Sequence, residues 1–546
     1  MKNNKHHLVE VRNLSVDFHT RHGIIHAVRN VNWHIERGET LAILGESGSG
    51  KSVSASAIMG LIDTPPGHIA SGQVLYNGED LLMASAERRR GINGRNIAMV
   101  FQDTLAALNP VYPIGWQVAE TFRAHGVVDA DGKRKAIELL ERVGLPEAAR
   151  RFSDFPHQFS GGQRQRIMIA MAIAMQPDLL IADEPTSALD VTVQSRILKL
   201  LKELQKETGM GLLLITHDLS IVGDMADRIA VMNNGQIVET GSVQQVFHQP
   251  QHAYTRQLLN ALPGRAGYSR PEPQAEGALP LLDVRGLSKQ YDAPNSLFRR
   301  AAKPLAPALT DASFYLKRGE TLGIVGESGS GKSTLARTLL GLETPTAGTV
   351  HYRGKDMLGL AGREFAKSRR GMQVVFQDPA ASLNPRMTVE EIISEPWAIH
   401  PDVLARDEWS KQVKVLLAQV GLDSGHAIRY PHQFSGGQRQ RIAIARALAL
   451  RPEIIICDEA VSALDVSVQA QVIALLKRLK TEYGLSYIFI AHDLPVVRDF
   501  ADRLLVMSKG VIVEQGLTKD LFENPSHPYT KELLGAYPVI DIPMSC

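Results

Sequence analysis

The stretch GESGSGKS occurs twice in this chain of 546 residues, at positions 45–52 and 326–333. Each copy follows a short apolar run, TLAIL or TLGIV, and precedes a run of small and aliphatic residues that is typical of a helix. A GxxxxGKS sequence binds phosphate when it lies between a strand and a helix, because its glycines let backbone N–H groups approach phosphate oxygens. The N-terminus of the helix adds partial positive charge. The sequence therefore predicts two nucleotide-binding loops.

The side chains of these loops have separate expected roles. Lys51 and Lys332 are expected on the β- and γ-phosphates, and Ser52 and Ser333 on a magnesium ion. Val53 stands where the second copy has a threonine. The loop residues predicted to contact nucleotide are Gly45, Ser47, Gly48, Gly50, Lys51 and Ser52 in the first copy and Gly326, Ser328, Gly329, Gly331, Lys332, Ser333 and Thr334 in the second.

The loops belong to a longer duplication. The motifs VFQD, FSGGQRQRI, DE, SALDV and HDL each recur at one constant offset, that between Val100 and Val375. The offset between Lys51 and Lys332 in the two loops is larger, so the first copy carries six extra residues between its loop and VFQD. We expect them in the polar stretch 88–94. A period this long indicates two whole domains, because solenoid repeats recur every 20–50 residues.

Domain boundaries follow from the duplication and from composition. Residues 263–280 are rich in proline and glycine and lack an apolar period, so they are predicted to be a linker. It would separate a first domain at 7–262 from a second at 281–540. In each copy, short apolar runs alternate with helical ones, which predicts an α/β fold with a largely parallel sheet.

Two apolar runs, LLIADE and IIICDE, each end in consecutive carboxylates. Asp183 and Asp458 are candidates for holding magnesium, and Glu184 and Glu459 for polarising the attacking water. A carboxylate at the end of a strand can instead cap the next helix. The phosphate loop in the same copy favours the catalytic interpretation.

With FSGGQRQR added to these motifs, the sequence resembles the ATP-binding subunits of ABC transporters over essentially the whole chain, in two copies. The resemblance implies two tandem P-loop NTPase domains of ABC type that hydrolyse ATP. Each would have a mostly parallel sheet core, an antiparallel β subdomain and a helical subdomain. It also implies that the SGGQ sequence of each copy, called the signature, completes the ATP site of the other copy. Ser160, Gly161, Gly162 and Gln163 would complete the site of Lys332, and Ser435, Gly436, Gly437 and Gln438 that of Lys51.

Further roles come from the same resemblance. Gln102 and Gln377 match the glutamines that approach the magnesium ion and the attacking water, and His217 and His492 match the histidines that contact the γ-phosphate. A histidine in this position can also be purely structural, but its identical spacing from the glutamate in both copies favours function. The remaining matches are Asp190 and Asp465 at the domain interface and Phe18 and Tyr291 against adenine, with core packing as the alternative for the two aromatic residues.

The segments PQHAYTRQLLNALP and PSHPYTKELLGAYP resemble the tail motif of ATPases that serve oligopeptide, dipeptide and nickel importers. They can equally be helices that pack on the domain. The resemblance implies two separate membrane permease subunits, an extracytoplasmic solute-binding protein, and a location at the cytoplasmic face of the inner membrane. Many members of that family bind an iron–sulfur cluster through several cysteines, but this chain has only two, and none is expected.

Composition excludes other classes of function. The net charge of +2 gives no general reason to expect nucleic acid as a partner, and no run of 18 apolar residues predicts a spanning helix. A soluble tandem ABC ATPase acting on ribosomes remains the alternative, although such proteins carry a long charged helical linker. A DNA-repair ATPase would need inserted zinc-binding cysteines, which two cysteines do not supply.

Overall fold

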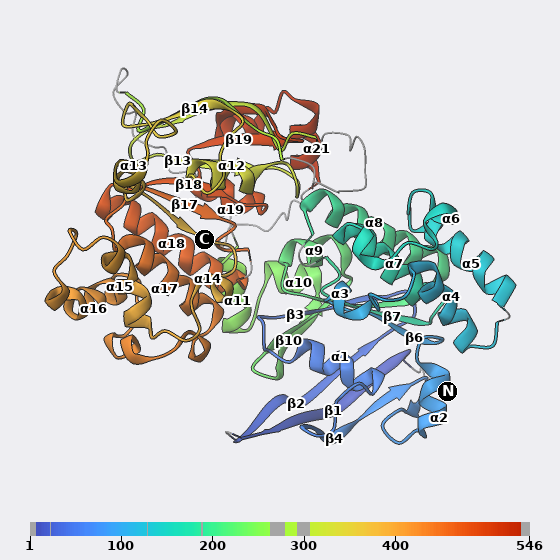
Figure 1. Cartoon of the computed structure of the whole chain (residues 1–546). Helices are drawn as coiled ribbons and strands as arrows, with labels where there is room; N and C mark the ends of the chain where they lie inside the picture. Colours follow the sequence, from blue (N-terminus) through green and yellow to red (C-terminus); the bar gives the residue numbers. More distant parts are fainter. Residues whose placement is uncertain are drawn as a thin grey trace. The chain divides into compact units, whose positions relative to one another are not determined.

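The computed structural model describes residues 7–21, 23–127, 129–186, 189–262, 279–291, 306–462 and 464–536 (Figure 1). This part of the chain divides into two compact units, the first ending at Ala261 and the second extending from Leu262 to Ala536. The predicted linker 263–280 falls outside the described residues except for its last two positions. The last four residues of the predicted second domain, 537–540, also lie outside them.

The first unit is built on a six-stranded sheet in the order β10-β9-β3-β8-β7-β6. Neighbouring strands are parallel except β10, which pairs antiparallel with β9. Strands covered on both faces read as uninterrupted apolar runs, which explains TLAIL and LLIAD. The bounds are β3 Thr40–Leu44, β6 Ile97–Val100, β7 Leu179–Asp183, β8 Gly211–Thr216, β9 Arg228–Asn233 and β10 Gln236–Ser242.

The second unit repeats this sheet, in the order β16-β17-β18-β13-β19-β20. Again only the last strand, β20, is antiparallel to its neighbour. The bounds are β13 Thr321–Val325, β16 Met372–Val375, β17 Ile454–Asp458, β18 Ser486–Ile490, β19 Arg503–Ser508 and β20 Val511–Leu517. The predicted α/β fold with a mostly parallel sheet in each copy is confirmed.

A smaller antiparallel sheet accompanies each core sheet, as the resemblance implied. Its order is β2-β1-β4-β5 in the first unit and β12-β11-β14-β15 in the second. The inward side chains of these strands join the hydrophobic core beneath the first helix of each unit. The bounds are β1 Val9–Thr20, β2 Gly23–Ile35, β4 Gly67–Tyr76, β5 Glu79–Asp80, β11 Leu282–Lys289, β12 Leu309–Leu316, β14 Ala347–Tyr352 and β15 Lys355–Asp356.

The expected position of the six extra residues, at 88–94, is wrong. Val74 pairs with Val11 as Val350 pairs with Val284, so Val74 and Val350 are equivalent. The offset between these two valines exceeds that of the later motifs by a single position, so five of the six extra residues precede Val74. They lengthen the connection after the first helix and extend β4, which continues along β1 as far as Phe18. The paired strands absorb the additional length, whereas polarity pointed to a loop.

Helices pack on the core sheets and form a helical part in each unit. Helix α4 contacts both α5 and α7, and α15 contacts both α16 and α17, so the predicted helical subdomains are present. The bounds of these helices are α1 Lys51–Met59, α4 Ile114–Ala124, α5 Asp129–Arg142, α7 Gly161–Ile173, α8 Val191–Thr208 and α9 Leu219–Met225, with α12 Lys332–Leu339, α15 Val389–Ile399, α16 Trp409–Gln419, α17 Gly436–Leu448, α18 Val466–Tyr483 and α19 Leu494–Phe500 in the second unit.

Further helices complete the two units, including the two that carry the tail motifs. In the first unit they are α2 Ala86–Ile92, α3 Thr104–Ala107, α6 Ala148–Arg151, α10 Val243–His248 and α11 Ala253–Asn260. In the second unit they are α13 Gly362–Arg369, α14 Pro379–Ser382, α20 Thr518–Glu523 and α21 Pro528–Gly535.

A carboxylate before β17 ties the antiparallel sheet of the second unit to its core sheet. Glu453 accepts hydrogen bonds from Tyr352 Oη, Arg353 Nε and Arg318 Nη1, each at 2.5 Å. Partial burial alone would raise the pKa of Glu453, but these hydrogen bonds lower it to about 2. Its counterpart in the first unit, Asp178, likewise bonds a tyrosine and an arginine. Both units therefore use one acidic residue to join their sheets.

Replacing Glu453 with glutamine should lower the free energy of unfolding by about 1 kcal/mol at pH 7. A carboxylate whose pKa is depressed in the folded state stabilises it above the unfolded pKa, near 4.5. That contribution is lost as the pH falls toward about 2, so the deficit of the variant should shrink at about pH 3.5. Urea unfolding of the parent and the variant at pH 7 and at about pH 3.5 measures this deficit in the free energy of unfolding. Glu482→Gln, which removes an exposed helical ion pair with Arg478, is the control, and an equal deficit at both pH values would contradict the assignment.

Candidate active sites

The phosphate loops occupy the carboxyl ends of β3 and β13, between each strand and the helix that follows. Gly50 and Gly331 cap α1 and α12 with left-handed backbones, at φ 102° and 103°. A Cβ at Gly50 would lie 2.3 Å from the carbonyl oxygen of Ala27, and one at Gly331 would lie 2.5 Å from that of Ala308. Only glycine fits at these positions. The loops therefore have the backbone conformation and the helix N-terminus that a phosphate group requires.

Each loop lysine is buried and turned toward its own loop. Lys51 Nζ donates to the carbonyl oxygens of Gly45 and Glu46 at 2.8 and 2.9 Å. Lys332 Nζ donates to those of Gly326 and Glu327, both at 2.8 Å. Both lysines are only 5% exposed. A buried ammonium group held by weak neutral acceptors is well placed to exchange them for an anionic phosphate.

The serine after each lysine contacts the aspartate at the end of the neighbouring strand. Ser52 Oγ donates to Asp183 Oδ1 at 2.9 Å, and Ser333 Oγ donates to Asp458 Oδ1 at 3.3 Å. Burial raises the pKa of both aspartates, and the adjacent glutamates raise it further. A hydroxyl and a carboxylate oxygen are ligands that suit Mg²⁺. The structure thus brings together two of the three predicted metal ligands in each copy, the serine and the aspartate.

In the first unit the candidate catalytic glutamate is held from two sides. Gln102 Nε2 donates to Glu184 Oε2 at 2.6 Å, and His217 Nδ1 lies 3.1 Å from Oε1. Burial would raise the pKa of Glu184, but the hydrogen bond and charge of His217, the charge of Lys51 and the hydrogen bond from Gln102 together outweigh burial and lower this pKa. The hydrogen bond to Glu184 raises the pKa of His217. Three residues that the sequence predicted separately therefore form one cluster.

The second unit has the same residues in a looser arrangement. His492 Nδ1 lies 3.7 Å from Glu459 Oε2, and contact with His492 lowers the pKa of Glu459. Gln377 is exposed. Both Glu459 and Glu184 have left-handed backbones, at φ 50° and 45°. Backbone strain of this kind in a residue other than glycine is frequent at functional sites.

The signature residues begin α7 and α17. Ser160 caps α7 by accepting the N–H of Gln163, whose side chain accepts the N–H of Ser160 in return. Ser435 and Gln438 form the same capping box on α17. The serine and glutamine thus have a structural role within their own unit. Asp190 similarly caps α8 by accepting the N–H of Val193.

The candidate adenine contacts differ between the units. Phe18, on β1, is half-buried and packs against the core cluster of the first unit, which supports the packing interpretation. Lys289 Nζ lies 5.0 Å from the ring centre of Tyr291 in the second unit. Among the residues with expected roles, all lie in the described part of the chain.

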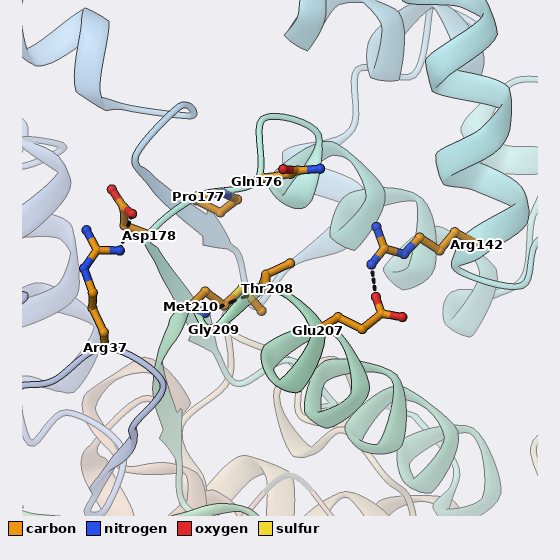
Figure 2. Close-up of a pocket in the computed structure, with 9 residues that line it drawn as sticks. All are labelled: Arg37, Arg142, Gln176, Pro177, Asp178, Glu207, Thr208, Gly209 and Met210. Atoms are coloured by element: carbon orange, nitrogen blue, oxygen red, sulfur yellow. Dashed lines mark hydrogen bonds and ion pairs between the residues drawn. The ribbon is translucent and has the colours of Figure 1, made fainter.

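A polar hollow of about 410 Å³ in the first unit lies at the amino ends of the core strands β7 and β8, away from the phosphate loop (Figure 2). Its lining includes Asp178 and Met210, which precede β7 and β8, whereas the phosphate loop follows the carboxyl end of β3. Figure 2 shows Arg37 directed to Asp178 and Arg142 directed to Glu207, so each cation already has a carboxylate partner. This hollow is separate from the nucleotide site.

Models of two known families match the chain. One, described as ABC transporter, matches residues 28–187 and 309–462, which is more than half of the chain. The chain belongs to the ABC transporter family. The second, described as oligopeptide/dipeptide transporter, C-terminal region, matches 238–286 and 513–545, which include both tail motifs.

Relatives match the ABC transporter chain over almost its full length. The glutathione import ATP-binding protein GsiA of Salmonella paratyphi A is 47% identical over 98% of this chain and 90% of its own length. The protein of the same name from Pectobacterium atrosepticum is 46% identical with the same coverage. A solved dimeric structure of the ATP-binding cassette MJ0796, in a post-hydrolysis state with ADP and Pi, is 31% identical over 43% of this chain and 98% of that chain, with a TM-score of 0.39.

These findings confirm the predicted family and activity. The chain is an ATP-hydrolysing subunit that energises solute import, and the ribosome-acting alternative is not supported. In the described ranges, none of the helices combines the length and apolar composition needed to span a bilayer.

Sequence reasoning missed one contact of each phosphate loop: the hydroxyl groups of Tyr254 and Tyr529 reach Glu46 and Glu327. The repeated HAYT and HPYT motifs were the available signal.

Proposed function

We propose that this subunit energises the import of peptides or a related small solute, with glutathione as the first candidate, through separate membrane permeases. The observation that carries the proposal is the 47% identity to a glutathione import ATP-binding protein over 98% of this chain. The tail match to oligopeptide and dipeptide transporters, present in both copies, supports it independently. The solute itself would be selected by the permeases and by an extracytoplasmic binding protein.

ATP with Mg²⁺ is the proposed substrate complex of each unit. Lys51 and the loop amides would hold the phosphates, and Ser52 with Asp183 would hold the ion, which neutralises charge on the transferring phosphoryl group. Glu184 would accept a proton from the attacking water while Gln102 and His217 orient its carboxylate. The corresponding residues of the second unit are Lys332, Ser333, Asp458, Glu459, Gln377 and His492.

We further propose, from the family resemblance, that the signature of each copy completes the ATP site of the other. The N-terminus of α7 or α17 would then supply N–H groups and partial positive charge to a γ-phosphate. ATP would join the two copies and its hydrolysis would release them, because the bridging phosphate is lost. Asp190 and Asp465 would act at this interface, and Phe18 and Tyr291 would contact adenine.

The proposed location is the cytoplasmic face of the inner membrane, bound to two permease chains, with no nucleic acid and no iron–sulfur cluster. Affinity purification of the tagged chain from detergent-solubilised membranes should recover two integral-membrane chains. Proteoliposomes that contain the resulting complex should accumulate labelled glutathione only when ATP is available to this subunit and the binding protein is present outside. Recovery of ribosomes without permeases would overturn the proposal. Uptake of a peptide in place of glutathione would identify a peptide as the imported solute.

A further inference from the structure

One tyrosine in the tail of each unit touches the phosphate loop. The hydroxyl oxygen of Tyr254 accepts the backbone N–H of Glu46 at 3.3 Å, across 208 residues of sequence. In the second unit the hydroxyl oxygen of Tyr529 accepts the N–H of Glu327 at 3.0 Å, across 202 residues. The same two atoms meet in both units although the surrounding tail sequences differ. The contact is therefore a repeated feature of the fold.

The tail residues that precede each tyrosine are fixed to the antiparallel edge strand. The carboxylate of Glu239, on β10, accepts the N–H groups of Gln251 and His252 at 2.8 and 3.0 Å. His252 Nδ1 then accepts the N–H of Tyr254 at 3.2 Å and caps α11. These hydrogen bonds fix the position and direction of the first turn of α11. They leave the tyrosine half-buried beside the loop.

The second unit reproduces the arrangement residue by residue. Glu514 accepts the N–H groups of Ser526 and His527 at 2.7 and 3.1 Å. His527 Nδ1 accepts the N–H of Tyr529 at 3.2 Å and caps α21. The histidine and the tyrosine of the tail motif thus have separate tasks. The histidine orients the helix, and the tyrosine extends the arrangement to the phosphate loop.

At the loop, a single residue lies between the tyrosine and the catalytic lysine. The N–H of Glu46 donates to Tyr254, while its carbonyl oxygen accepts a hydrogen bond from Lys51 Nζ. A turn of Lys51 toward a phosphate would release that carbonyl, whereas the bond to Tyr254 involves a different atom and would persist. The tyrosine is then the contact that keeps the start of the loop in place while the lysine is exchanged.

We propose that Tyr254 and Tyr529 are positioning residues that hold the phosphate loops in the conformation that binds ATP. The loop conformation is needed equally in the ATP complex and in the transition state, so losing the hydroxyl should weaken binding of both alike. Such a loss raises KM and leaves kcat nearly unchanged. The proposal rests on the ATPase activity of the chain and is independent of which solute is imported.

The test is the full-length chain with Tyr254→Phe and Tyr529→Phe combined, which keeps both rings and removes only the hydroxyl groups. We expect KM for ATP, and the Kd of a fluorescent ATP analogue, to rise about threefold to tenfold, the range expected for one lost hydrogen bond per site. The value of kcat should stay within about twofold of the parent. Each single variant should weaken binding of the ATP analogue at only one of the two sites.

A packing control separates positioning from general stabilisation. Leu258 and Leu533 are buried in the same two helices, each 4% exposed. Their replacement by alanine should lower Tm and leave KM for ATP unchanged at temperatures where the variant is folded. An unchanged KM in the tyrosine double variant would overturn the proposal. A fall in Tm matching that of the leucine variants, with no change in KM, would assign the tyrosines a packing role only and would also overturn it.

Discussion

Replacing both Glu184 and Glu459 with glutamine should reduce steady-state ATP hydrolysis at least about a hundredfold and leave ATP binding intact. Glutamine has the shape of glutamate and can still contact His217 or His492, but it cannot accept a proton from the attacking water. The lysines, serines and aspartates that would hold ATP and magnesium are unchanged. Phosphate release measures the rate, and a fluorescent ATP analogue measures binding.

The single variants test whether both sites turn over. Each of Glu184→Gln and Glu459→Gln should depress the rate, by at least about half if the two sites contribute equally. The surface variant Glu138→Gln, which removes an exposed ion pair with Arg134, should leave it unchanged. If either single active-site variant retained the full rate, the prediction of two competent sites would be wrong.

The two sites share residues but differ in geometry, which bears on these rates. Glu184 is fixed between Gln102 and His217, at 2.6 and 3.1 Å. Glu459 has His492 at 3.7 Å, so it begins from a less constrained position. A less constrained carboxylate must become ordered before it can accept a proton. We therefore expect Glu459→Gln to remove the smaller share of the activity.

Local sequence was sufficient to predict the parts of the site that lie close together along the chain. A buried strand, a glycine-rich loop and the start of a helix follow one another without interruption in GETLAILGESGSGKS. Each of these features depends on neighbours whose chemistry can be read directly. Both copies show them with the same geometry, and the core sheets followed from the same apolar runs.

Contacts between distant segments could not be predicted in the same way. Tyr254 and Glu46 meet because β10 and α11 return to the phosphate loop, a consequence of the folded topology. Glu453 needs three partners from other segments of its unit before its pKa falls to about 2. Most of the extra residues of the first copy lengthen β4 and the connection before it, because the added part of β4 pairs with β1. Composition alone pointed to a loop, since it does not show which strands pair.

Substituting alanine for Gly50 should abolish ATP binding at the first loop, and Gly331→Ala should do so at the second. Each glycine has a left-handed backbone, at φ 102° and 103°, that costs an alanine about 1–2 kcal/mol. The new Cβ would also lie 2.3 or 2.5 Å from the carbonyl oxygen of Ala27 or Ala308, and backbone cannot move aside as a flexible side chain can. The loop must therefore leave the conformation that presents its N–H groups to phosphate.

Binding stoichiometry provides the sharpest measurement of this effect, because the chain carries one phosphate loop in each unit. We expect either alanine variant to reduce the nucleotides bound per chain from two to one, and the double variant to bind none, as measured by equilibrium dialysis with a non-hydrolysable ATP analogue. Gly209→Ala and Gly484→Ala are matched controls: both glycines are left-handed C-caps, at φ 67° and 63°, with open space around an added Cβ. They should lose about 1 kcal/mol of stability and keep two bound nucleotides, because strain alone does not reach the loop. Full binding by Gly50→Ala would mean that the loop can hold ATP in another conformation, and the steric argument would fail.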